Sequence, residues 1–128
     1  MAVEHLNKDA DRDGLSRSVL IVDVELRLRQ AGITVLSADS DDAPILYVAV
    51  TAVRSRYEPV YAYFVEIDLR QVVVLGRNVS FSTYAATWWA TATVATVGAA
   101  RFPDSVRGSI RNQVDEFINT YLAVNPKR

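Results

Sequence analysis

Cysteine is absent from this chain of 128 residues, and histidine and methionine each occur once. Without cysteine there is no thiol nucleophile, no disulfide and no cysteine-ligated zinc site. The single histidine, His5, lies near the start of the sequence, so a cluster of histidine metal ligands is excluded and a serine triad would depend on that one residue. We therefore expect His5 to be a surface or sheet-edge residue.

Neither sign of charge is in excess, because 14 lysine and arginine residues oppose 15 aspartate and glutamate residues, which leaves a net charge of −1. A broad basic footprint for nucleic acid is missing, so no nucleic-acid partner is expected. No segment has the length and continuous apolarity of a transmembrane helix, and the first residues do not resemble a signal peptide. We predict a soluble chain without a membrane span. Export is still compatible with this sequence, because processing removes a signal peptide.

Alternating apolar and polar residues fill most of the segment 43–98 in three long runs, joined by short turns. Period-two alternation predicts strands, and such short connections require antiparallel neighbours. A short strand at 33–37 and a loop at 37–44 are predicted to precede these runs. The strands are therefore expected to form one sheet over residues 33–98.

Helices are predicted on both sides of the sheet, over residues 15–31 and 103–124. Ser16 suits the first N-cap, Gly32 ends that helix, and Pro103 suits the first turn of the second. The first helix is expected to place one apolar stripe against the sheet, made of Leu15, Val19, Val22 and Leu26.

The composition, 50% hydrophobic and 23% charged, is typical of a globular domain, and one domain is expected over residues 1–128. Residues 1–14 are predicted to form an N-terminal strand and an acidic loop. The predicted fold class is α+β, with two layers: an antiparallel sheet of about four to five strands and two helices packed on one face.

The alternation also predicts which side chains face away from the helices. In the second long run, Glu66, Asp68 and Arg70 must be on the wet side, because burying unpaired ions is costly. In the third run, Trp88 is predicted to face the core together with Tyr84, Ala86, Ala90, Ala92 and Val94. Provided that no bulge intervenes, the predicted free face carries Tyr47, Thr51, Glu66, Asp68, Arg70, Thr87, Trp89 and Thr91.

Asp9, Asp11, Asp13 and Gly14 spell the first half of a calcium-binding loop, since alternating carboxylates before a glycine can supply oxygen ligands. The second half does not fit, because Leu20 occupies the position of the bidentate glutamate and no helix is predicted before the loop. An ordinary acidic loop before a helix N-terminus explains the same residues. Calcium is the only cofactor that we consider, with these three aspartates as its ligands.

Glu66 and Asp68 lie two residues apart on one strand face, which is compatible with hydrolysis by a carboxylate pair. The alternative is an ordinary wet face on which Arg70 neutralises Asp68. Trp89 is flanked by threonines and faced by Tyr47, and an exposed indole on a sheet often marks a contact surface. No glycine-rich phosphate loop follows a predicted strand.

Three segments, DVELRLRQAGITVLS (23–37), YAATW (84–88) and VDEFINTYLAVNP (114–126), resemble a group of uncharacterised bacterial proteins of small α+β type. In that group the domain tends to follow a secretion signal, so the resemblance implies an exported or periplasmic protein. It implies no catalytic or binding residue. This sequence differs from the group in having no signal and in its TWWATATVATV run, where the related sequences are richer in glycine.

The leading functional hypothesis is a non-enzymatic binding or assembly module that uses the free sheet face, or a sheet edge, to pair with a second copy or a protein partner. Two alternatives stay open. One is a hydrolase that uses Glu66 and Asp68, and the other is a calcium-binding protein.

Overall fold

The computed structural model describes residues 1–4, 6–36 and 43–126. His5 and most of the loop predicted at 37–44 lie outside these residues. The elements follow the order β1 (Ala2–Val3), α1 (Lys8–Arg12), α2 (Arg17–Gln30), β2 (Ile45–Arg54), β3 (Val60–Leu75), β4 (Asn78–Trp89), β5 (Thr93–Gly98), the 3₁₀ turn η1 (Ala99–Arg101) and α3 (Phe102–Val124).

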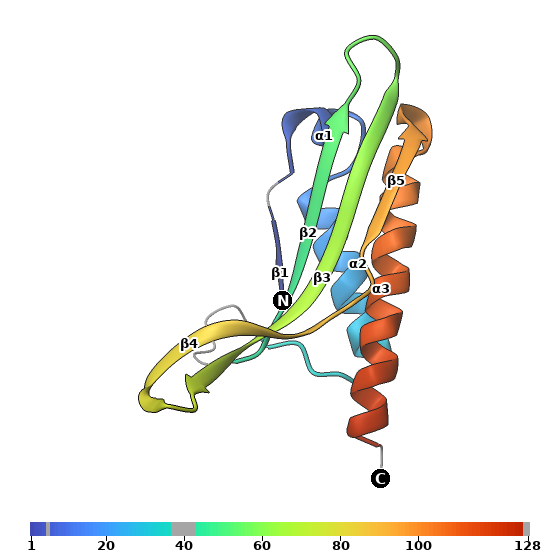
Figure 1. Cartoon of the computed structure of the whole chain (residues 1–128). Coiled ribbons are helices and arrows are strands. Elements are labelled where there is room, and N and C mark those ends of the chain that lie inside the picture. The colour runs from blue at the N-terminus through green and yellow to red at the C-terminus, as the bar shows by residue number, and fades with distance from the viewer. Residues whose placement is uncertain (5, 37–42, 127–128) are drawn as a thin grey trace.

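One five-stranded sheet forms the first layer, with α2 and α3 packed on a single face of it (Figure 1). The long strand β3 is central, because it pairs antiparallel with β2 along one edge and with both β4 and β5 along the other. The α+β prediction is confirmed. The sheet is mixed, however, because β1 pairs parallel with β2. β1 can do so because two helices separate it from β2 and return the chain to the starting end.

Two local predictions in the first third of the chain are wrong. No strand forms over residues 33–36, and among the described residues β1 is the strand that borders β2 at this edge of the sheet. The predicted acidic loop contains the short helix α1, whose first turn is capped by the Asn7 side chain accepting from the Ala10 backbone N–H at 2.9 Å. Asn7 also donates to the Ala52 carbonyl at 2.8 Å, which ties this helix to β2. The sequence pattern missed α1 because one turn is too short to show helical periodicity.

Helix α2 begins and ends as predicted, but it is rotated relative to the prediction. Ser16 caps it by accepting from the Val19 N–H, and Gly32 follows its end with a positive φ of 82°. The residues that it buries are Leu20, Val24 and Leu28, whereas Val19, Val22 and Leu26 of the predicted stripe are exposed. Apolar and polar residues are distributed around the helix without one clear apolar face, so its sequence could not decide which stripe meets the sheet.

Helix α3 has one apolar stripe, with residues at three- and four-residue steps, and Val106, Ile110, Val114, Phe117 and Ile118 of this stripe are all buried. The core between helices and sheet is anchored by Phe102, which is fully buried and stacks on Tyr61 with ring centroids 3.8 Å apart. Gln113 is the one buried polar residue of this core among the described residues; its side-chain amide donates to the Val65 carbonyl and to the Thr93 hydroxyl, both at 3.0 Å.

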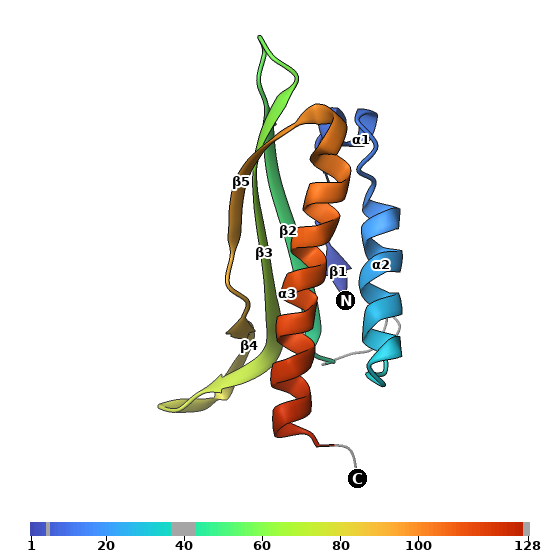
Figure 2. The ribbon, with the colours of Figure 1, turned by 90° about the vertical axis from the view of Figure 1, so that its right-hand side faces the viewer.

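The paired ends of β3 and β4 leave the body of the molecule as a projecting hairpin. Figure 2 shows this hairpin turning away from the helices, toward the uncovered side of the sheet. The register shifts between Leu69 and Arg70, where Leu69 pairs with Trp88 but Arg70 pairs with Ala86. A bulge of this kind bends a strand pair and increases its twist. We call residues 71–85, which lie beyond this bulge, the β-arm.

Candidate interaction surface

The sheet face opposite the helices is the first candidate site, and its centre is a row of three paired residues. Tyr47 pairs with Asp68 across β2 and β3, and Asp68 pairs with Trp89 across β3 and β4. Trp89 is 69% exposed, whereas Trp88 beside it packs against the core. The predicted assignment of the two tryptophans to opposite faces is therefore correct. We call this side of β2, β3, β4 and β5 the free face.

Charged and tyrosine side chains form an electrostatic cluster at one end of this row. The Arg70 guanidinium donates to Asp68 at 2.8 Å and lies 3.8 Å from the centroid of the Tyr47 ring. The Tyr47 hydroxyl donates to Glu4 at 2.5 Å. This hydrogen bond to a carboxylate raises the pKa of Tyr47, and the bond to Asp68 raises the pKa of Arg70. The cluster fixes the side chains in place and leaves Glu66, farther along β3, exposed.

The other end of the free face is apolar. Val94 is 77% exposed and pairs in register with Phe64, although the alternation placed Val94 in the core. The alternation inverts because the chain leaves the strand at residues 90–92, where Ala90 is buried and donates its N–H to the Ile67 carbonyl. Thr93 therefore faces α3, and Val94 faces away from it. Together with Trp89 and Val53, this gives the free face a string of exposed apolar side chains.

Two of the eight predicted free-face residues lie elsewhere. Thr87 occupies the bulge and has no register partner on β3, and its hydroxyl donates to the Leu69 carbonyl at 3.4 Å. Thr91 lies between β4 and β5, and its N–H and hydroxyl donate to the Glu116 carboxylate of α3. Tyr84 and Ala86 were predicted in the core but are exposed, because the bulge at Thr87 moves them to the other side of the strand.

The β-arm was not foreseen from the sequence. Six large hydrophobic side chains on it are exposed, namely Val72, Val74, Leu75, Val79, Phe81 and Tyr84. Val72 and Tyr84 are register partners, and they continue the side of the sheet that carries Arg70. One signal was available, because the run QVVVL has apolar residues at consecutive positions, whereas a strand with one wet face would alternate.

The carboxylate pair Glu66 and Asp68 does lie on one face, as predicted, but neither residue lines the two main cavities found among the described residues. Asp68 is neutralised by Arg70, whose Nε and Nη2 donate to its two oxygens at 2.8 and 3.3 Å. Neither carboxylate contributes to the lining of the cavity between the helices. A catalytic carboxylate needs an environment that sets it apart from an ordinary surface acid. The arrangement matches that of an ordinary wet face.

The three aspartates of the calcium hypothesis are not gathered around one point. Asp9 pairs with Arg12 at 2.9 Å, and Asp13 accepts from the Tyr61 hydroxyl at 2.5 Å and pairs with Arg54 at 3.2 Å. The phenol hydrogen bond and the arginine lower the pKa of Asp13. Within the described ranges, no three carboxylate or imidazole side chains are placed to hold a metal ion. Asp13 instead connects the end of α1 to β2 and β3.

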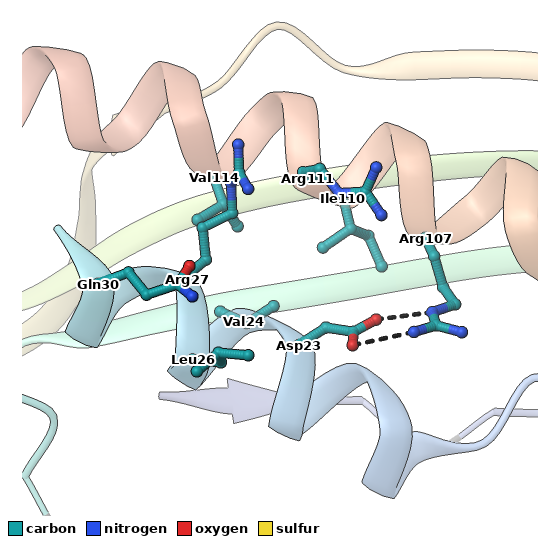
Figure 3. A pocket seen from close by; sticks show the side chains of 9 residues that line it. All are labelled: Asp23, Val24, Leu26, Arg27, Gln30, Arg107, Ile110, Arg111 and Val114. Carbon is teal, nitrogen blue, oxygen red and sulfur yellow. Dashed lines mark hydrogen bonds and ion pairs between the residues drawn. The ribbon is translucent and has the colours of Figure 1, made fainter.

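The contact between α2 and α3 contains a small polar pocket of about 170 Å³ (Figure 3). Two ion pairs connect α2 and α3 at this pocket: Arg107 with Asp23 at 2.7 Å, and Arg27 with Asp115 at 2.5 Å. Each aspartate raises the pKa of its arginine. The guanidinium groups of Arg27 and Arg107 are thus engaged by carboxylates, and these ion pairs join the two helices. A third arginine, Arg111, also lines the pocket and is exposed.

The chain matches no protein-family model and no curated protein. The resemblance to exported bacterial proteins therefore remains a prediction. None of the helices in the described part of the chain combines the length and the apolarity that a bilayer crossing requires.

Proposed function

We propose that this protein is a non-enzymatic assembly module that forms a symmetric homodimer through its free face and β-arm. The observation that carries the proposal is the string of exposed apolar residues, which runs from Val94 and Trp89 on the free face to Val72 and Tyr84 on the arm. Large exposed apolar surfaces on a soluble domain usually mark a contact surface. A partner that covers them would remove this area from water.

The β-arm itself argues for a partner. A hairpin of two strands is only marginally stable in water when nothing packs against it. In the described part of the chain, β4 pairs with β3 alone, so the outer edge of the arm has unpaired backbone groups. Exposed edges of this kind readily add another strand or another surface. A second subunit would supply both the apolar cover and the hydrogen-bonding partners.

Charge complementarity favours a second copy of this chain as that partner. Arg77, at the tip of the arm, is the only charged residue between Gln71 and Thr87. The free face offers the exposed carboxylate of Glu66, and the exposed Glu4, which follows β1 and accepts from Tyr47, lies beside it. In a two-fold dimer the same patch occurs on both subunits, so each arm can bring its arginine to the acidic part of the opposite face.

A charge exchange tests this arrangement. Sedimentation equilibrium should give a dimer for the natural sequence, and Arg77→Glu and Glu66→Arg should each weaken it by about tenfold, since each places like charges together. The combined variant should recover most of the loss. Arg56→Glu, at an exposed position in the loop between β2 and β3, is the matched control and should leave the dimer unchanged. A monomer at all accessible concentrations would refute the proposal, as would a combined variant that is weaker than both single ones.

A further inference from the structure

A second apolar feature lies on the helix side of the sheet, away from the free face. It is a groove of about 580 Å³ between the last turns of α3, the end of α2 and the base of the β-arm. Residues of the segments 1–2, 33–36 and 43–46 form half of its lining, and the large apolar side chains from the other elements are Leu28, Leu69, Trp88, Phe117, Tyr121 and Val124. The volume is within the range of roughly 300–1,000 Å³ that small-molecule sites occupy.

The groove is elongated along α3. Phe117, Tyr121 and Asn125 line it at successive turns, so it follows the helix for about 12 Å, given a rise of about 1.5 Å per residue. An aromatic series covers this length, because the rings of Trp88 and Phe117 are 5.3 Å apart and those of Phe117 and Tyr121 are 5.9 Å apart. A wall of this length and character fits a linear hydrocarbon chain.

The polar side chains that line the groove are neutral. Among the described residues that line it, no side chain is acidic or basic. Thr87, Thr120 and Asn125 are exposed, and the Asn125 amide donates to the Tyr121 carbonyl at 3.1 Å, which leaves its oxygen free to accept from a ligand. Hydroxyl and amide groups at the mouth of an apolar site favour an uncharged polar head, because they can exchange hydrogen bonds with it.

We propose that this groove binds the hydrocarbon chain of a neutral amphiphile, with the chain along α3 and a hydroxyl-bearing head at Thr120 and Asn125. An anionic amphiphile is a poorer fit, since no side chain of the described lining is cationic and its carboxylate would meet only neutral groups at Thr120 and Asn125. The site does not depend on the proposed dimer, because the free face carries Trp89 and the groove contains Trp88.

The two tryptophans make the groove directly observable, because the chain has no others. Trp89→Phe leaves Trp88 as the only indole, and its emission should shift to shorter wavelength as monolauroylglycerol, added below its critical micelle concentration, fills the groove. We expect a saturable shift with one ligand per chain. Laurate, which has the same hydrocarbon chain and a negative head, should bind at least about tenfold more weakly, which is a difference of about 1.4 kcal/mol.

A pair of matched variants, built on Trp89→Phe, locates the site. Leu36→Asp combined with Val124→Asp places two carboxylates on the groove at positions that are 55% and 72% exposed. Val22→Asp combined with Leu26→Asp places two on α2 at positions that do not line the groove and are 62% and 53% exposed. The first pair should weaken binding by about tenfold or more, because it places unpaired charges beside the bound hydrocarbon chain. The second pair should bind as before.

Several results would overturn the assignment. Absence of a saturable Trp88 shift would mean that the groove does not bind this amphiphile, and equal losses in the two paired variants would place binding elsewhere. Laurate binding as tightly as the neutral lipid would contradict the inferred preference for an uncharged head. Loss of ligand binding as the protein concentration rises into the dimer range would mean that a second copy occupies the groove.

Discussion

Trp89→Ala is the most direct test of the free face as a dimer contact. An aromatic side chain can bury roughly 150–250 Å². Trp89 is 69% exposed in the single chain, so a partner can still remove roughly 140 Å² of it from water. At about 25 cal/mol per Å², this corresponds to about 3.5 kcal/mol per indole, as an upper limit.

Part of this free energy is offset by the ordering of side chains on association. A central tryptophan typically contributes at least about 2 kcal/mol when it is truncated to alanine. A two-fold dimer contains two copies, so the substitution should cost about 4 kcal/mol and raise the dissociation constant by about a thousandfold. Because Trp89 contacts the core only marginally, the free energy of unfolding of the monomer should change little.

The dissociation constant would be measured by sedimentation equilibrium, and the unfolding free energy by urea titration at concentrations where the variant is monomeric. Tyr57→Ala is the control, since Tyr57 is 95% exposed in the loop between β2 and β3 and lies off the free face. Equal dissociation constants for the natural chain and Trp89→Ala would refute the dimer contact. A large loss of monomer stability would show that Trp89 belongs to the core.

Three further outcomes are expected. Phe102→Ala should lower the free energy of unfolding by about 3–5 kcal/mol in urea titrations, because it empties a fully buried site against Tyr61; a loss below about 1 kcal/mol would contradict the core assignment. Burial and the bond to Asp13 raise the pKa of Tyr61 to about 12. The unfolded chain loses this proton near pH 10, so stability should fall between about pH 10 and 12, a fall that Tyr61→Phe removes; an unchanged slope would exclude Tyr61 as its source. Calcium at millimolar concentration should leave the melting temperature unchanged, because Asp9 and Asp13 are each paired with an arginine, and a rise reversed by chelator would revive the calcium hypothesis.

The candidate surface was predictable where the alternation is regular. From Tyr61 to Arg70 every second residue faces α3, and this placed Glu66, Asp68 and Arg70 on the free face correctly. Beyond Arg70 the prediction failed. One extra residue at the bulge and the departure of residues 90–92 from the strand each inverted the pattern, so Tyr84 and Val94 were assigned to the wrong side.

The apolar groove could not be predicted from the sequence, for a different reason. Leu28, Trp88 and Phe117 belong to three elements that are far apart in the chain, and each looks like an ordinary core residue by itself. The groove lies where the last turns of α3, the end of α2, the segments 33–36 and 43–46 and the base of the β-arm come together. The placement of these segments relative to one another is not encoded in local periodicity.

The sequence by itself determined the α+β class, the two long helices on either side of the block of strands, and the separation of Trp88 from Trp89, because caps, turns and period-two alternation act over a few neighbouring residues. Only the tertiary structure decided that β1 joins the sheet in parallel, that α2 buries Leu20, Val24 and Leu28, and that the β-arm leaves the sheet. These outcomes depend on which apolar side of a helix or strand packs best against another element of the fold. That choice is made by packing between distant segments, and no short stretch of the chain contains both partners.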